Sequence, residues 1–251
     1  MKLYFVGAGP GDPELLTLKA ARLLSECVCC IYAGSLVPET VTGMVNKDAV
    51  LYDSSRMTLD QIIATMKSYA DKDCTVVRLH TGEPSLYGAI GEQMARLDAC
   101  GIEYEIVPGV SSYQAAAAAL KCELTVPGGS QTVILSRVAG RTPVPKEQSL
   151  GNIAPLKATL CLFLSVGAMD TIVKELSPHY GSDCPVAVVM YASRKNQKVV
   201  RGTLITIAEQ IAKSDIKKTA MVIIGEALSG SQSESYLYNK FFSHEYRDAQ
   251  S

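Results

Sequence analysis

The feature that most constrains this chain is an alternation, through its first 120 residues, of short apolar runs with helix-like segments. The apolar runs are rich in Val, Ile and Leu and have the length of strands. Strands are expected at residues 3–6, 27–32, 49–53, 74–80 and 104–107. Strands that are apolar throughout and separated by helices form a parallel sheet with both faces covered. The first part of the chain therefore predicts an α/β domain with a mainly parallel sheet.

The helix-like segments between these strands carry recognisable start and stop signals. The first expected helix begins at Pro13, because proline suits the first turn of a helix. The second follows Thr58, which predicts an N-cap, and runs to residue 70. Further helices are expected at 89–100, ended by Gly101, and at 111–120.

A second set of elements follows the first. Residues 127–129 are the best linker candidate, and residues 121–123 are the alternative hinge. Beyond them we expect strands at 131–136, 158–164, 185–191, 198–201 and 220–224, with helices near 169–176 and 203–213. The last two strands before residue 203 are close enough for a hairpin around 193–197, so this sheet should be mixed. We predict two α/β domains, residues 1–120 and 121–251.

Charge and hydropathy argue against several classes of partner. Lys and Arg total 24 and Asp and Glu total 25, so the net charge is −1 and no cationic excess exists to neutralise a nucleic acid. No stretch approaches the roughly 18 apolar residues of a transmembrane helix. The N-terminal apolar run is interrupted at residues 9–14, before a signal peptide is complete. We expect a cytoplasmic protein without a nucleic-acid or membrane partner.

Eight cysteines raise the question of disulfides or a metal. A chain of this size without a secretion signal is expected to keep them reduced. In the strand-like segment around Cys27, Cys29 and Cys30, alternation would place the first two on one face and the third on the other. Because three ligands so arranged do not converge, we expect buried packing and no metal site.

Three glycine-containing loops are the main functional signal. They read VGAGPGD at 6–12, LHTGEPSLYG at 79–88 and VPGVSS at 107–112, and each follows an expected strand and precedes a helix. The first departs from the G-x-G-x-x-G spacing of dinucleotide folds. Ligands of open α/β sheets bind outside the carboxyl ends of the strands. Three such loops on one sheet therefore predict a ligand-binding site.

These segments resemble the tetrapyrrole methylases. The resemblance rests on VGAGPGDPELLTL, GEPSLYG and PGVSSYQAAAAAL and extends to about Gly225. The strings YAGSLVP, LHTG, SQTVIL and GRTPVP are similar to the branch of this family that acts at carbon 11 of precorrin-4. The resemblance implies methyl transfer from S-adenosylmethionine (SAM) to a corrin precursor, a cleft between two domains that holds SAM, and a homodimer.

The resemblance also assigns SAM contacts by position. In the first domain they are Pro10, Thr81, Gly82, Glu83, Leu86, Ser111 and Ser112. In the second domain they are Ser165, Ala192, Thr219 and Ala220. The chain departs from the family at one position, since the family usually has Asp where this sequence has Glu83.

Methyl transfer from a sulfonium to an electron-rich carbon needs in-line approach, a dry site and removal of a proton, and it needs no metal. The candidate catalytic residues are Glu83, Tyr32 and Tyr87. Glu83 either accepts a proton or helps to bind SAM, and we favour the binding role. The tyrosines either donate hydrogen bonds or form an apolar wall.

Precorrins carry several carboxylates, so a protein of neutral net charge must bind them through local cations. Arg141 and Arg194 are the candidates, because arginine binds carboxylates with two parallel hydrogen bonds. Ser35 and His80 are further candidate substrate contacts, and a structural hydrogen bond is the alternative role of His80.

Other functions fit parts of the pattern. Another tetrapyrrole methylase, such as a uroporphyrinogen-III methyltransferase, or a diphthine synthase, would share the SAM loops with a different acceptor. A non-catalytic nucleotide-binding module would use the same α/β loops. A cobalt-handling protein would use Cys27, Cys29 and Cys30 as ligands.

Overall fold

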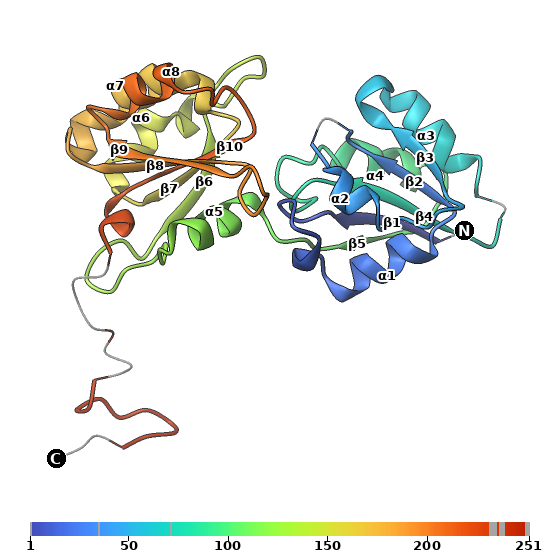
Figure 1. The fold of residues 1–251 in the computed structure, drawn as a ribbon, viewed down its shortest axis with the longest axis horizontal. Coiled ribbons are helices and arrows are strands. Elements are labelled where there is room, and N and C mark those ends of the chain that lie inside the picture. The colour runs from blue at the N-terminus through green and yellow to red at the C-terminus, as the bar shows by residue number, and fades with distance from the viewer. Residues whose placement is uncertain (1, 35, 71, 231–234, 236–238, 249–251) are drawn as a thin grey trace. The chain divides into compact units, whose positions relative to one another are not determined.

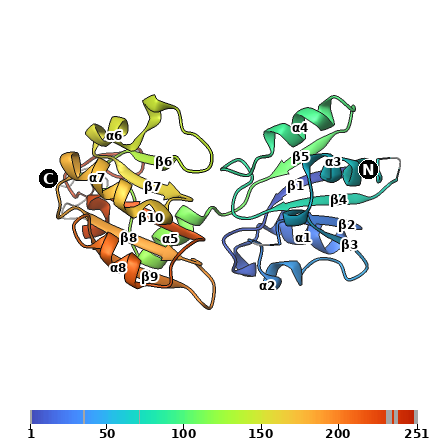
Figure 2. The ribbon, with the colours of Figure 1, turned by 90° about the horizontal axis from the view of Figure 1, so that it is seen from above.

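The computed structural model describes residues 2–34, 36–70, 72–230, 235 and 239–248. It contains two five-stranded sheets (Figures 1 and 2). The chain divides into two compact units. Unit 1 is Met1–Ala115 with Tyr191–Gln197, and unit 2 is Ala116–Met190 with Lys198–Ser251. No helix in these described ranges is long and apolar enough to cross a membrane.

Unit 1 is built on a sheet of strand order β3-β2-β4-β1-β5 in which every pairing is parallel, as predicted. Its strands are β1 (Lys2–Gly7), β2 (Cys29–Tyr32), β3 (Val50–Asp53), β4 (Thr75–His80) and β5 (Tyr104–Val107). Its helices are α1 (Leu18–Glu26), α2 (Glu39–Thr42), α3 (Leu59–Lys67) and α4 (Gly91–Asp98), followed by the start of α5 (Ser112–Leu120). Because β4, β1 and β5 are neighbours, the loops that follow them meet at one edge of the sheet.

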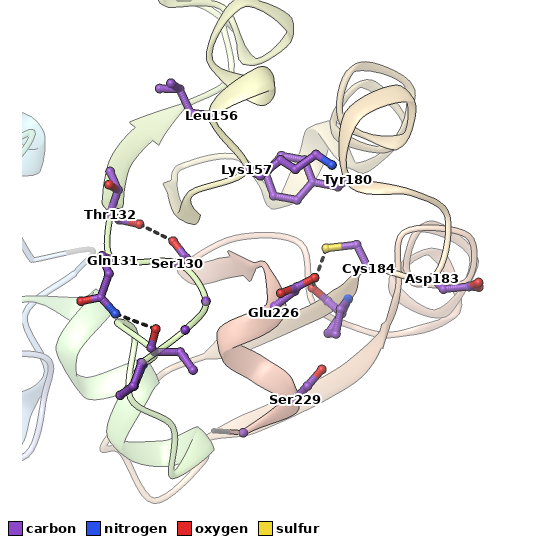
Figure 3. Close-up of a pocket in the computed structure, with 16 residues that line it drawn as sticks. Ser130, Gln131, Thr132, Leu156, Lys157, Tyr180, Asp183, Cys184, Glu226 and Ser229 are labelled. Carbon is purple, nitrogen blue, oxygen red and sulfur yellow. Dashed lines mark hydrogen bonds between the residues drawn. The ribbon is translucent and has the colours of Figure 1, made fainter. Parts of the chain in front are cut away.

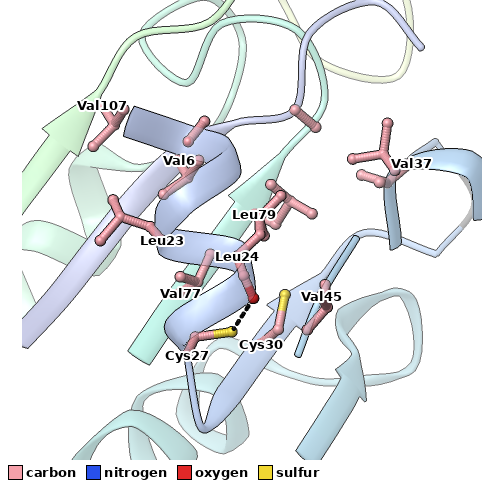
Figure 4. Close-up of a cluster of buried hydrophobic side chains, with 13 residues drawn as sticks. Val6, Leu23, Leu24, Cys27, Cys30, Val37, Val45, Val77, Leu79 and Val107 are labelled. Atoms are coloured by element: carbon pink, nitrogen blue, oxygen red, sulfur yellow. Dashed lines mark hydrogen bonds between the residues drawn. The ribbon is translucent and has the colours of Figure 1, made fainter. Parts of the chain in front are cut away.

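Both faces of this sheet are covered. On one face, Leu23 and Leu24 of α1 pack with Val77 and Leu79 of β4 (Figure 4). On the other face, side chains of α3 and α4 pack against Phe5 and its neighbours. Burying a Leu or Phe side chain stabilises the fold by about 1.5–3 kcal/mol, so these two layers hold the sheet in place.

The cysteines near β2 are core residues, as expected, but their faces differ from the prediction. Cys27 and Cys30 lie in the α1-side cluster (Figure 4), whereas Cys29 lies in the α3-side cluster. The prediction that Cys27 and Cys29 share a face is wrong, because the strand begins at Cys29 and Cys27 is the C-cap of α1. Burial raises the pKa of the Cys27 and Cys29 thiols to about 11. In the described part of the chain, no three His, Cys, Asp or Glu residues are placed to hold a metal ion.

The start of the first helix also differs from the prediction. Pro13 opens a short 3-10 turn, Pro13–Leu15, in which the Asp12 carboxylate accepts a hydrogen bond from the Glu14 N–H at 3.0 Å. Leu16 is then extended, and α1 begins only at Leu18, capped by the Thr17 hydroxyl at 3.1 Å. Two successive capping residues thus divide what the apolar spacing presents as one helix.

The predicted N-cap of the next helix is confirmed. The Thr58 hydroxyl accepts the Gln61 N–H at 3.3 Å, and the Gln61 side chain accepts the Thr58 N–H at 2.8 Å. This reciprocal capping box fixes the start of α3.

Unit 2 is built on a sheet of strand order β6-β7-β10-β8-β9. Its strands are β6 (Val133–Arg137), β7 (Thr159–Phe163), β8 (Pro185–Met190), β9 (Lys198–Thr203) and β10 (Ala220–Ile224). Only β6 and β7 pair in parallel, so the predicted mixed sheet is confirmed. The helices α6 (Leu150–Ile153), α7 (Met169–Tyr180) and α8 (Ile207–Lys213) lie on one face of this sheet (Figure 1).

The predicted hairpin between β8 and β9 is present, and its loop, Tyr191–Gln197, groups with unit 1. The division between the units falls after Ala115, inside α5, and not after residue 120. Residues 127–129, the linker candidate, lie within unit 2 in a turn closed by a 2.8 Å bond from the Val126 N–H to the Ser130 carbonyl.

Candidate functional site

Three loops of unit 1 meet at the carboxyl edge of its sheet: loop 1 (residues 8–12), loop 2 (81–90) and loop 3 (108–111). Loops 1 and 2 are joined by backbone hydrogen bonds between Gly9 and Gly82, at 2.8 and 3.3 Å. The Ala8 N–H also donates to the His80 carbonyl at 2.7 Å. The parallel pairing of β1 with β4 therefore continues as a direct contact between the loops.

Glycine is required where the strand end of β1 meets loop 3. A Cβ added to Gly7 would lie 2.6 Å from the Gly109 Cα and from the Gly82 carbonyl oxygen. A Cβ added to Gly109 would lie 2.8 Å from the Gly7 Cα. Because these neighbours are backbone atoms, they cannot move aside cheaply. Gly7 and Gly109 thus permit contact between segments of the chain itself.

Gly82 serves a different purpose. Its φ of +61° favours glycine, but a Cβ added there would meet nothing nearer than 3.8 Å, at the Ser111 Cα and Ser112 N. A Cβ at Gly82 would therefore make ordinary van der Waals contact with the backbone at the N-terminus of α5. This is where the sequence predicts close approach of a ligand to the backbone.

Glu83 joins loop 2 to loop 3. One of its carboxylate oxygens accepts the Gly109 N–H at 2.8 Å, and the other accepts the Ser85 N–H at 2.9 Å. Burial acts to raise the pKa of this carboxyl, but the hydrogen bonds from Gly109 and Ser85 outweigh burial and lower it. Glu83 is thus an ionised acceptor held by two backbone donors.

The remaining predicted SAM contacts of the first domain lie around these loops. Pro10 is buried in loop 1, and Thr81 and Leu86 are half-buried in loop 2. Ser111 is buried, and its N–H donates to the Gln114 side chain at 2.9 Å at the start of α5. The structure therefore gathers at this edge every first-domain residue that the resemblance assigns.

The residues assigned to the second domain divide between the two units. Ser165, Thr219 and Ala220 belong to unit 2, whereas Ala192 belongs to unit 1. The Ser165 hydroxyl takes part in two hydrogen bonds within the fold, because it accepts the Val138 N–H at 2.8 Å and donates to the Phe163 carbonyl at 2.6 Å.

Backbone strain is concentrated near the predicted site residues. Eight non-glycine residues of the described chain have positive φ, and all but Ala89, Lys121 and Lys157 lie at or directly beside a predicted SAM or catalytic position. These five are Tyr87, Leu164, Tyr191, Ser193 and Thr219. Strained backbone of this kind persists where the surrounding structure holds it, and it gathers at functional sites.

His80 ends β4 beneath loop 2, and its side chain is 5% exposed. Its Nε2 atom is buried without a hydrogen-bond partner in the described structure. Burial, together with the charge of Arg78, lowers the pKa of His80 to about 3. Arg78 is itself buried and donates to Gln93 and to the Ile31 carbonyl, at 3.1 and 3.2 Å. His80 is therefore a neutral imidazole. Both roles expected for it, a substrate contact and a structural hydrogen bond, stay predictions.

The tyrosine candidates occupy different environments. Tyr32 ends β2 and packs against the α1-side cluster. Tyr87 is 46% exposed, with φ of 56°. Ser35, the predicted substrate contact near Tyr32, lies outside the described residues.

The two arginine candidates differ in their contacts. Arg141 is exposed and has no hydrogen-bond or ion-pair partner among the described residues. Its loop is held by Arg137, which donates to the carbonyls of Thr142 and Pro143 at 3.1 and 2.6 Å. The Arg194 guanidinium instead donates to backbone carbonyls of unit 1.

One polar residue of this edge was missed by the sequence analysis. Asp53, at the end of β3, accepts the N–H groups of Gly34 and Ser55, both at 2.9 Å. The hydrogen bonds from Ser55 and Gly34 lower the pKa of its carboxyl. An Asp that precedes two serines at a strand end signals a local turn, but its bond to Gly34 needs the pairing of β2 with β3.

A cavity of about 950 Å³ lies elsewhere, within unit 2 (Figure 3). Its lining includes Ser130, Lys157, Tyr180 and Glu226. The cavity lies at the edge where β7 and β8 begin and β10 ends, and none of the predicted site residues lines it.

The glycine contact predicts that Gly109→Ala destabilises the protein, by about 1–3 kcal/mol, because the new methyl group overlaps backbone atoms. Urea unfolding measures the change. Gly91→Ala is the matched control, since a Cβ at this helical position meets nothing within 4 Å and should leave stability equal or slightly higher. Equal stabilities of the two variants would contradict the close contact.

The depressed pKa of His80 predicts a pH-dependent stability. Between its ordinary pKa of 6.5 and about 3, the unfolded chain binds a proton that the folded chain does not. Stability present above pH 6.5 is therefore lost as the pH falls, by up to about 1.4 kcal/mol per pH unit from this group. Urea unfolding of the wild type and of His80→Gln between about pH 7.5 and 5 isolates this contribution, and parallel pH profiles would refute it.

Comparisons with known proteins identify the family of this chain and its fold. A family model described as Tetrapyrrole (Corrin/Porphyrin) Methylases matches residues 2–208. The cobalt-precorrin-4 C(11)-methyltransferase of Methanocaldococcus jannaschii is 50% identical over 248 residues, which cover 98% of this chain and 96% of the relative. A solved cobalt precorrin-4 methyltransferase, described as a cobalamin biosynthetic enzyme, has a TM-score of 0.88 and 42% identity, covering 90% of this chain and 95% of the other.

A more distant solved structure carries a ligand in its description. It is a uroporphyrin-III C-methyl transferase from Thermus thermophilus complexed with S-adenyl homocysteine, with a TM-score of 0.74 and 30% identity. The match covers 91% of this chain and 99% of the Thermus thermophilus chain. The resemblance stated from the sequence motifs is thus confirmed over nearly the full length, and this chain belongs to the tetrapyrrole methylase family.

Proposed function

We propose that this chain is a SAM-dependent methyltransferase that methylates carbon 11 of cobalt-precorrin-4, or of its cobalt-free counterpart, to give the corresponding precorrin-5 in cobalamin biosynthesis. The observation that carries the proposal is the 50% identity to a cobalt-precorrin-4 C(11)-methyltransferase across 98% of the chain. The strings GSLVP and GRTPVP, which the sequence analysis relates to this branch, support it.

The carboxyl edge of unit 1 is the proposed SAM site. When bound, SAM supplies an electrophilic methyl group on a sulfonium sulfur. The fit is supported by the position of Gly82 in loop 2, beside the backbone of Ser111 and Ser112 at the start of the nine-residue helix α5. Pro10, Thr81, Glu83 and Leu86 border the same loops and complete the first part of the proposed site.

Ser165, Ala192, Thr219 and Ala220 are proposed to complete SAM binding from the second part of the chain. Positive φ at Leu164, Tyr191 and Thr219 supports a role for the backbone there, because such strain exposes N–H and C=O groups in unusual directions.

Glu83 is proposed to position loops 2 and 3 and not to act as the general base. Its two oxygens already accept the N–H groups of Gly109 and Ser85. Its lowered pKa also makes it a weak base near neutral pH, where an effective base has a pKa closer to 7. Tyr32 and Tyr87 remain proposed contributors to the wall of the reaction site.

Glu83→Gln tests this role. A glutamine accepts one of the two N–H groups through its oxygen, but its NH₂ group faces the other donor, so the clamp between the loops is lost. We expect SAM to bind about tenfold more weakly, with a single-turnover rate at saturating SAM within a few-fold of wild type. Calorimetric titration and rapid-quench measurements give the two values.

Glu103→Gln is the control, because Glu103 is an exposed carboxylate of the same unit with no described partner. Unchanged SAM affinity with a roughly hundredfold slower methyl-transfer step in Glu83→Gln would assign Glu83 to proton removal instead.

Substrate carboxylates are proposed to bind at local cations, since the net charge of −1 supplies no general attraction. Arg141 is exposed on a loop anchored by Arg137, which leaves its guanidinium available for a bidentate contact. Ser35 and His80 remain proposed substrate contacts, His80 as a neutral imidazole.

The decisive experiment incubates the protein with methyl-labelled SAM and three acceptors: cobalt-precorrin-4, precorrin-4 and uroporphyrinogen III. Label at carbon 11 of either precorrin supports the proposal, and the preferred form identifies the cobalt requirement. Label only on uroporphyrinogen III would assign the chain to another branch of the family. SAM binding without transfer to any acceptor would favour a non-catalytic module.

A homodimer and a cytoplasmic location are further proposals that rest on the family resemblance. Sedimentation velocity tests the first, and fractionation of cells that produce the protein tests the second. A monomer, or recovery outside the cytoplasm, would overturn the respective proposal.

A further inference from the structure

The loop Tyr191–Gln197, although it follows β8 in the chain, contacts two distant segments of unit 1 through one side chain. Arg194 Nε donates to the Pro10 carbonyl at 3.2 Å, and its Nη2 donates to the Leu36 carbonyl at 2.7 Å. Pro10 is 184 residues away in sequence and Leu36 is 158 residues away. A single planar guanidinium therefore bridges loop 1 and the segment that follows β2.

Loop 1 is shaped to accept this side chain. Gly11 has φ of +142°, and a Cβ added there would lie 2.6 Å from Arg194 Cγ. The Ser193 hydroxyl accepts the Asp12 N–H at 3.1 Å. The Thr40 hydroxyl, at α2, donates to the Gly11 carbonyl at 3.2 Å. Three consecutive residues of loop 1, Pro10 to Asp12, are thus held by side chains from other segments.

The loop that carries Arg194 is itself closely defined. Tyr191 and Ser193 have φ of 52° and 71°, and the Ser193 N–H donates to the Gln197 side chain at 2.9 Å. The Arg194 guanidinium carbon lies 5.1 Å from the centre of the Tyr191 ring, a cation–π distance. The arginine is therefore presented from a preorganised turn, and Ala192, a proposed SAM contact, lies within that turn.

We propose that Arg194 is a positioning residue that couples the proposed SAM loop to residues 36–38, which follow the proposed substrate contact Ser35 in the chain, by bonding to a carbonyl of each. This inference rests on the proposed function, which identifies loop 1 with SAM and the segment around residue 35 with substrate. It differs from the sequence-based hypothesis that Arg194 binds substrate carboxylates, and it is favoured because the Arg194 Nε and Nη2 atoms already donate to backbone carbonyls. Loss of Arg194 should disorder both segments together.

The test measures SAM affinity without any tetrapyrrole present, by calorimetry, in Arg194→Ala and Arg194→Lys. We expect SAM to bind about tenfold more weakly to Arg194→Ala. Arg194→Lys should resemble the alanine variant, because an ammonium keeps the charge but is too compact to bridge both carbonyls. Lys195→Ala is the matched control, since it removes an exposed cation from the same loop and should bind SAM like wild type.

Hydrogen exchange supplies a second readout that does not require SAM. The amides of Gly11, Asp12, Leu36 and Val37 should exchange faster in both Arg194 variants and remain unchanged in Lys195→Ala. If either SAM affinity or exchange in these segments stays at the wild-type value in folded Arg194→Ala, the proposal is overturned. A substrate-ligand role would instead give normal SAM affinity, with a raised substrate KM that Arg194→Lys partly restores.

The proposed function fails separately from this inference. If the wild-type protein binds no SAM, the function is wrong, and hydrogen exchange alone then decides whether Arg194 holds the two segments. If the wild type binds SAM and the variants match it, only the role of Arg194 is refuted.

Discussion

The backbone contact among Gly7, Gly82 and Gly109 is the constraint on which the candidate site depends. No side-chain atoms separate these three positions, so the segments that follow β1, β4 and β5 touch one another directly. The Gly9–Gly82 bridge extends this contact beyond the sheet. Loops at the end of a parallel sheet are ordinarily mobile and independent. Here they form one connected edge.

This connection explains how loop 2 tolerates strain. Tyr87 and Ala89 both have positive φ, which costs free energy in a non-glycine residue. One end of the loop is held by Gly82 and Glu83, and the other by the Gln93 side chain, which donates to the Ala89 carbonyl at 3.0 Å. Because Gln93 also accepts a bond from the buried Arg78, the far end of loop 2 is tied to the interior of β4.

The sequence was sufficient to predict the architecture and the edge at which the site lies. Apolar strands alternating with helices predict a parallel sheet, and a parallel sheet places all loops that follow its strands at one edge. The short spacing of β8 and β9 likewise predicted the hairpin. These features depend on residues close together in the chain, where hydrophobic periodicity and turn-forming residues can be recognised from the sequence.

What escaped prediction depends on contacts between distant residues or on two local signals in competition. The helix start was misplaced because Pro13 and Thr17 both favour an N-terminus, and only packing decides between them. The prediction of which sheet face Cys27 occupies was wrong because the strand begins two residues later, at Cys29. The contacts of Arg194 span 158 and 184 residues, and no local pattern distinguishes such an arginine from one exposed to solvent.

Glu83 shows how a departure from the family pattern can be read physically. Asp, the residue that the family resemblance implies at this position, is shorter by one methylene, about 1.5 Å. The Glu83 carboxylate spans from its own loop, at Ser85, to the neighbouring loop, at Gly109, with both bonds below 3.0 Å. With an otherwise unchanged backbone, an Asp carboxylate drawn back by that length would lie beyond hydrogen-bonding distance of the Gly109 N–H. The longer side chain therefore adds an inter-loop bond at the place where the backbones of Gly82 and Gly109 are already in close contact.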